Sequence, residues 1–112
     1  MLQYQKNLNQ KRDASDPWRE LANAIIEQAA DDYRRSMTKK IKLGLKLSDL
    51  EMPIINSRIN ECKQFFESGW GYFLSRGLAP VIWERLQAEF KDELAELEEE
   101  LARRKEEKHD QR

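Results

Sequence analysis

Residues Phe65–Leu74, with the sequence FFESGWGYFL, hold five of the ten aromatic residues of this 112-residue chain. Aromatic side chains bury large areas and dominate the energetics of cores and interfaces. Ser68 and the glycine after it indicate a helix break, with Ser68 as the cap of a short helix that follows. The stretch therefore predicts either the hub of a small helical core or a surface for a partner.

Helical spacing divides these aromatic residues between the two roles. We expect Phe66, Trp70 and Phe73 to lie in the core, because large apolar residues at helical spacing are most often buried. Three other aromatic residues are the candidates for exposure and for contact with a partner: Phe65, Tyr72 and Trp83.

Amphipathic patterns predict a long helix on the N-terminal side of this hub and a second helix leading into it. Asp16 is a good N-cap, Pro17 suits the first helical position, and apolar residues then recur at steps of three and four as far as Met37. We expect the first helix from about Pro17 to Met37. The second helix should end near Ser68, and four residues share its apolar face: Ile55, Ile59, Cys62 and Phe66.

Residues 38–53 lack a clear helical pattern. Apolar and polar residues alternate from Ile41 to Leu47, which is the period of an extended segment, although Gly44 weakens a strand. We expect a long connection between the helices, in which Ser48-Asp49 can cap a new turn. The alternative is that the first helix continues toward Lys46.

A long last helix should begin at Ala79-Pro80, after a short helix from Gly69 to Arg76. Residues 91–107 carry eight acids and four bases in seventeen residues. The large apolar residues in that half form a narrow seam, as in a coiled coil: Leu94, Leu97 and Leu101. This seam predicts self-association as a homodimer, and the alternative is a solvated helix that protrudes from the body.

These patterns predict an all-α fold, a compact three- to four-helix domain with a long acidic C-terminal helix and a flexible N-terminal arm. Only four Gly and three Pro are present, which favours helices over a turn-rich β fold. We expect residues 1–14 to form the arm and residues 15–90 the helical domain. Residues 91–112 should form a polar helical extension with a disordered tail.

The residues that usually carry chemistry are too few or too far apart to form a site. The single cysteine, Cys62, has apolar neighbours, and the single histidine, His109, lies in a charged tail, so neither a zinc site nor a Cys–His pair is expected. Adjacent acids on a helix point to different faces. Gly69-Trp70-Gly71 lacks the Gly-Lys-Ser/Thr ending of a phosphate-binding loop. We therefore expect no enzymatic activity, no cofactor and no metal.

Two charged segments are candidate contact surfaces. On the last helix an acidic face, with Glu98 beside it, is a candidate for binding a partner protein: Glu84, Glu89, Asp92, Glu93, Glu96, Glu99 and Glu100. The segment 34–46 has six bases and no acid, a pattern that can contact nucleic-acid phosphates: Arg34, Arg35, Lys39, Lys40, Lys42 and Lys46. A net charge of −1 and a pI of about 5.9 make nucleic acid the alternative partner.

Two further segments carry a resemblance to a known family. They are WRELANAIIEQA at residues 18–29, followed by Asp32-Tyr33-Arg34, and INECKQFFESGW at residues 59–70, leading to Leu86. Together they resemble small uncharacterised helical proteins encoded by phages and prophages of Gram-positive bacteria. The chain departs from that family at Gly69, Gly71 and the long acidic helix. The resemblance implies expression in the cytoplasm of a bacterial host and an accessory role.

These observations favour a non-enzymatic phage accessory protein that binds a host or phage macromolecule. Inhibition of a bacterial defence enzyme such as a CRISPR nuclease is one specific form, in which the acidic face mimics nucleic-acid charge. A nucleic-acid-binding protein using residues 34–46 and a self-assembling structural protein are the alternatives. No apolar run approaches the roughly 20 residues of a membrane span, so we expect no membrane contact.

Overall fold

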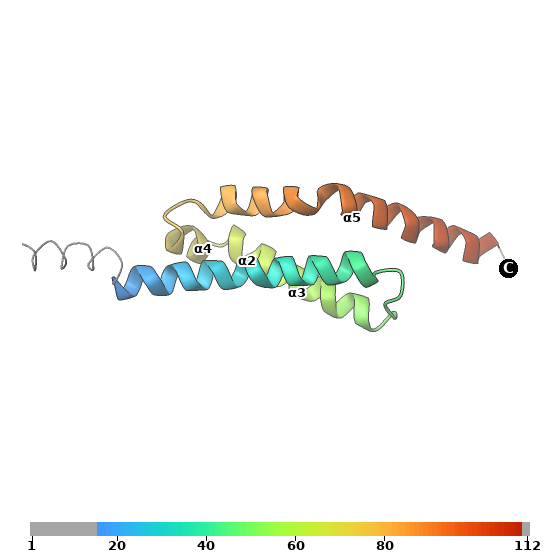
Figure 1. Ribbon diagram of the computed structural model, residues 1–112, viewed down its shortest axis with the longest axis horizontal. Helices are drawn as coiled ribbons and strands as arrows, with labels where there is room; N and C mark the ends of the chain where they lie inside the picture. The colour runs from blue at the N-terminus through green and yellow to red at the C-terminus, as the bar shows by residue number, and fades with distance from the viewer. Residues whose placement is uncertain (1–15, 111–112) are drawn as a thin grey trace, which may run out of the picture.

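The computed structural model describes residues 16–110, which form four helices and no strand. The helices are α2 (Pro17–Leu43), α3 (Glu51–Glu67), α4 (Gly69–Leu74) and α5 (Ala79–Asp110). The three long helices pack along one direction, and short α4 lies between α3 and α5 in the chain (Figure 1). The predicted all-α fold is thus confirmed over these residues. The arm predicted at 1–14 and the last two residues lie outside the described part.

The helix α2 begins and ends for identifiable local reasons. The Asp16 carboxylate accepts hydrogen bonds from the backbone N–H groups of Trp18 and Arg19, at 3.1 and 3.3 Å, as predicted for an N-cap. The prediction that α2 ends at Met37 was wrong, because the helix runs to Leu43. Ile41 packs against the same core as Met37, so burial holds this last part in the helix. The alternative prediction, that the first helix continues beyond Met37 toward Lys46, is confirmed as far as Leu43.

The connection between α2 and α3 is short and brings α5 close to the backbone. A β-carbon placed on Gly44 would clash with the backbone carbonyl oxygen of Lys40 and would lie 2.9 Å from the methyl carbons of Leu97 in α5, so a larger residue cannot fit there without movement. The Ser48 hydroxyl accepts a hydrogen bond from the N–H of Glu51 at 3.1 Å, as predicted for a residue that caps a new turn. The expected long connection is therefore reduced to residues 44–50.

The core lies where α2, α3 and α5 meet. Phe66 is 1% exposed and stacks on Trp83, with ring centroids 5.6 Å apart. Tyr33 packs edge-on against the other side of this cluster, 4.8 Å from the Trp83 ring. The remaining buried members of the cluster are small or aliphatic: Ala30, Met37, Cys62, Ala79 and Leu86. The prediction for Phe66 is confirmed, whereas the expected exposure of Trp83 was wrong, because Trp83 is the centre of the aromatic packing.

The buried phenol of Tyr33 makes the stability of the fold sensitive to alkaline pH. Burial raises the pKa of Tyr33 above its ordinary value of 10.0, and the nearby Cys62 and Glu89 raise it further. The unfolded chain therefore loses this proton at a lower pH, so stability is full below about pH 10 and falls as the pH rises through the folded-state pKa. We expect Tyr33→Phe to reduce the fall in thermal midpoint between about pH 9 and 11, measured by circular dichroism. Tyr72→Phe removes an exposed phenol as the control, and an unchanged fall in Tyr33→Phe contradicts the prediction.

The helix α5 is continuous and passes the domain boundary expected at residue 90 without a break. The Ser75 hydroxyl accepts a hydrogen bond from the N–H of Ala79 at 2.8 Å and so caps the start of the helix. Leu94 packs against the core and Leu97 is buried, so the packed body includes part of the expected extension. Beyond the α2–α3 connection, α5 projects alone (Figure 1). None of the described helices is both long enough and apolar enough to cross a membrane.

Candidate functional site

The short helix α4 presents three aromatic side chains to solvent. Trp70, Tyr72 and Phe73 are 53%, 58% and 61% exposed, respectively. The buried side of α4 is occupied by Gly71 and Leu74. The prediction that Trp70 and Phe73 lie in the core was therefore wrong, because a helix of six residues has one buried face and two other residues fill it.

The three exposed rings divide between two sides of α4. Trp70 and Phe73 stack on each other with centroids 5.9 Å apart. Tyr72 turns the other way, toward Gly77, and borders a hollow of about 530 Å³ that Trp83 also lines. Because successive helical residues are about 100° apart, Trp70 and Phe73 face away from this hollow.

The first turns of α2 add exposed apolar residues beside α4. The Arg19 guanidinium donates a hydrogen bond to the carbonyl oxygen of Leu74 at 3.2 Å, which fixes the start of α2 against the end of α4. Trp18 and Leu21, on either side of Arg19 in the chain, are both more than half exposed. We call four of these exposed apolar residues the α4 surface: Trp18, Leu21, Trp70 and Phe73.

The structure separates the three aromatic residues that were predicted to contact a partner. Tyr72 is exposed, but it lies on the other side of α4 from Trp70 and Phe73. Phe65 is half-buried and lines a groove between α2 and α3, and Trp83 lies in the core. Sequence reasoning missed all four members of the α4 surface. The available signal was the shortness of the helix between Ser68 and Gly77, which cannot bury four large side chains.

The acidic face of α5 is only partly free. Glu89 accepts two hydrogen bonds from Arg34, at 3.0 and 2.9 Å, and the bonding from Arg34 lowers the pKa of Glu89. Glu100 pairs with Arg103 and Arg104 of its own helix, at 3.1 and 3.6 Å. Within the described part of the chain, the other predicted members are exposed and form no ion pair: Glu84, Asp92, Glu93, Glu96 and Glu99.

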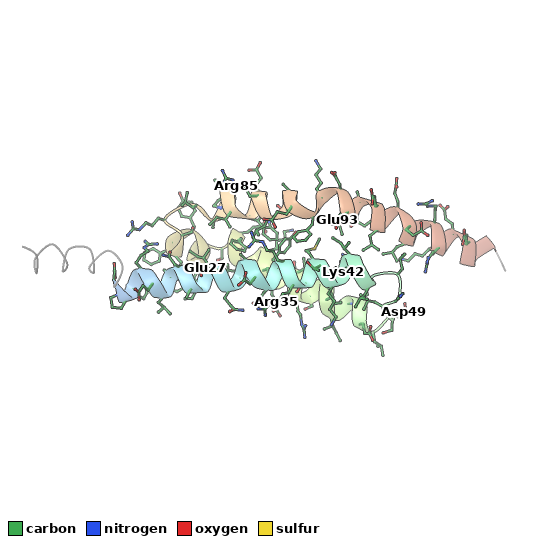
Figure 2. All side chains as sticks on the ribbon, viewed as in Figure 1. Glu27, Arg35, Lys42, Asp49, Arg85 and Glu93 are labelled. Atoms are coloured by element: carbon green, nitrogen blue, oxygen red, sulfur yellow. The ribbon has the colours of Figure 1, made fainter. Side chains whose placement is uncertain are left out.

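The six bases between residues 34 and 46 do not form one surface. Arg34 is engaged by Glu89, Lys40 is half-buried, and Lys46 lies in the connection after α2. Three bases remain on one exposed side of α2 at helical spacing: Arg35, Lys39 and Lys42. Figure 2 shows Arg35 on the side of α2 that faces away from α5. Any contact with phosphates would therefore rest on three residues rather than six.

A groove of about 720 Å³ runs between α2 and α3 and is lined only by these two helices. Its apolar floor includes four residues: Ile25, Ala29, Cys62 and Phe65. Burial raises the pKa of the Cys62 thiol, and the nearby carboxylates of Asp32 and Glu61 raise it further. A reactive cysteine needs the opposite shift. The Cys62 thiol in this groove is therefore not activated. Four charged residues are among those that line the groove: Asp32, Arg35, Arg58 and Glu61.

Neither metal ligands nor known relatives add to this picture. Among the described residues, no three His, Cys, Asp or Glu side chains are grouped so that they could hold a metal ion. Comparison with family models, with curated proteins and with solved structures finds no match to this chain. The resemblance to small phage proteins stays a prediction, and the inference of function rests on the surfaces of the molecule itself.

Proposed function

We propose that this chain is a non-enzymatic binding protein that docks on a partner protein through the α4 surface. The observation that carries the proposal is the exposure of Trp18, Trp70 and Phe73, each more than half accessible at one end of the molecule. Large exposed apolar patches on soluble domains mark interaction sites. Tryptophan and tyrosine are also the residues most enriched at energetic hot spots of interfaces.

The α4 surface is held in place before any partner arrives, which favours binding. The Ser68 hydroxyl accepts a hydrogen bond from the Gly71 N–H at 2.9 Å and donates one to the Phe65 carbonyl at 2.7 Å. At the other end of α4, the N–H of Gly77 donates to the Tyr72 carbonyl at 2.8 Å. Aromatic side chains on a fixed backbone lose little conformational entropy when they bind. The fitting partner is a protein with an apolar pocket or groove.

A narrower form of the proposal is a phage accessory protein acting inside a bacterial host, where it inhibits a defence nuclease. The exposed acids of α5 support it, since a row of carboxylates can occupy a site made for phosphates. Asp92, Glu93 and Glu96 are exposed and form no ion pair within the described residues. Nucleic-acid binding through Arg35 and its neighbours on α2 remains the alternative function.

Loss of two rings from the α4 surface is expected to abolish capture of the partner. Tagged wild-type protein and the variant Trp70→Ala/Phe73→Ala would be incubated with lysate of the cells that express it, at moderate salt and after nuclease treatment. Because each hot-spot truncation costs about 2 kcal/mol or more, we expect the affinity for the captured protein to fall at least about a hundredfold. The matched control is Leu45→Ala/Leu50→Ala, which removes exposed apolar residues from the connection between α2 and α3.

The outcomes of this experiment separate the candidate functions. Equal capture by wild type and by Trp70→Ala/Phe73→Ala contradicts docking through the α4 surface. Loss of capture in Asp92→Lys/Glu96→Lys assigns the contact to the acidic face and favours the nuclease inhibitor. Retention only when nucleic acid is intact moves the site to the basic side of α2, which Arg35→Ala/Lys39→Ala then tests by the salt dependence of binding.

A further inference from the structure

One side of α3 carries a pattern that is symmetric about the middle of the helix. Ile54, Arg58, Glu61 and Phe65 follow each other at steps of four, three and four, so they lie along one face. The two inner residues have opposite charges and the two outer residues are apolar. An antiparallel second copy of α3 would therefore place Arg58 opposite Glu61 of the second copy, and Ile54 opposite its Phe65.

The helix α2 adds the same kind of charge pair at the same level of the groove. Asp32 and Arg35 line the groove together with Arg58 and Glu61. The carboxylates of Asp32 and Glu61 both act on Cys62 at the groove floor, which places them around one point. These four residues, which we call the charged rim, comprise two acids and two bases. The rim is neutral, and after a two-fold rotation it can set acids against bases.

All four members of the charged rim are exposed to solvent. Among the described residues, none of its four side chains forms an ion pair, and Asp32 accepts one hydrogen bond, from Gln28 at 2.9 Å. Ile54, at one end of the stripe, is 54% exposed. The groove between α2 and α3 opens to solvent above its apolar floor. A partner whose surface carries a single sign of charge would be repelled by half of the rim, because like charges that are brought together oppose binding.

We propose that the α2–α3 groove is the interface of an antiparallel homodimer whose two-fold axis passes near the middle of α3. Two-fold dimers are the commonest oligomers, and they require a surface that is complementary to itself. The stripe on α3 and the charged rim meet that requirement in both charge and apolar character. The interface does not use the α4 surface, so it goes beyond the proposed function. It also moves self-association away from the seam at Leu94, Leu97 and Leu101, where Leu97 is already buried.

Paired charge-swap variants test the dimer directly. Arg35→Glu/Arg58→Glu makes the rim wholly acidic, and Asp32→Lys/Glu61→Lys makes it wholly basic. We expect wild type to have twice the chain mass of 13.4 kDa by light scattering, and each variant alone to be a monomer, with dimerisation weakened at least about a hundredfold. An equimolar mixture of the two variants should recover the dimer, and native mass spectrometry should identify it as the mixed species.

The apolar ends of the stripe have a closely matched control. Ile54→Asp places a charge opposite Phe65 of the second copy, whereas Val81→Asp alters an exposed β-branched residue that also follows a proline but lies on α5, outside the α3 stripe. Only Ile54→Asp should dissociate the dimer, with both variants keeping the wild-type circular dichroism.

Monomeric wild type at about 1 mM overturns the proposal, because the dissociation constant of any such dimer would then be above 1 mM. Dimers that persist in the charge-swap variants overturn this interface, and neither result bears on capture through the α4 surface.

Discussion

Replacement of Phe66 by alanine is expected to destabilise the fold by about 3–5 kcal/mol, the range for deleting a buried aromatic ring. Phe66 is among the largest fully buried side chains. It stacks on Trp83 and also meets the ring of Phe65 edge-on at 5.2 Å, so its loss leaves a cavity between α3 and α5. Since small domains are stable by only about 5–15 kcal/mol, much of the reserve would be removed.

Urea unfolding followed by circular dichroism measures this effect, and Phe73→Ala is the matched control. Phe73 is the same residue type, but it is 61% exposed on α4. The control should change the free energy of unfolding by less than about 1 kcal/mol, as is usual for exposed positions. Equal losses in the two variants would contradict the assignment of Phe66 to the core and Phe73 to the surface.

Features that depend on neighbouring residues were predictable from the sequence. The caps at Asp16, Ser48 and Ser68 were identified because a short polar side chain satisfies N–H groups two or three residues ahead. The helical character of the chain and the burial of Cys62 followed from local patterns in the same way. The alternation of apolar and polar residues after Ile41 predicted an extended segment, and this prediction was wrong. In so short a segment, burial against the core determines whether the chain is helical or extended.

The buried face of α2 was only partly predictable. The helical period predicts one apolar stripe: Trp18, Leu21, Ala22, Ile25, Ala29, Tyr33 and Met37. Its members Ala22, Tyr33 and Met37 are buried, as predicted, whereas Trp18 and Leu21 are more than half exposed. The neighbouring residues Ile26 and Ala30, which are not in this stripe, pack in the core. The helical period does not select between such overlapping faces, and only the positions of α3, α4 and α5 do so.

Contacts between distant segments were beyond sequence reasoning for the same reason. Arg34 and Glu89 are 55 residues apart and were assigned to separate binding surfaces, yet they pair with each other. The α4 surface likewise depends on α2 and α4 being neighbours, which the Arg19 side chain secures. A single sequence gives the faces of each helix but not which faces meet.

Replacement of Leu97 by glutamate is expected to cost about 3 kcal/mol or more, because an unpaired charge would be placed in a buried site. Leu97 is 7% exposed and lies against Gly44, where α5 closes over the end of α2. The carboxylate would have to leave this contact to reach water, and the second half of α5 would leave with it. Urea unfolding and amide hydrogen exchange from Ala95 to Leu101 would measure the two consequences.

Leu101→Glu distinguishes this intrachain role from a dimer seam. If the leucines of α5 join two chains, both substitutions act by dissociating a dimer, and both effects depend on protein concentration. If Leu97 packs on Gly44, its loss is independent of concentration, and Leu101→Glu costs less because Leu101 is only half-buried. Gly44→Ala approaches the same contact from the connection after α2, so the part of its cost that comes from Leu97 should be relieved in a Leu97→Ala background. The part that comes from the Lys40 carbonyl oxygen should remain. Strict additivity of the two changes would show that Gly44 and Leu97 are not energetically coupled.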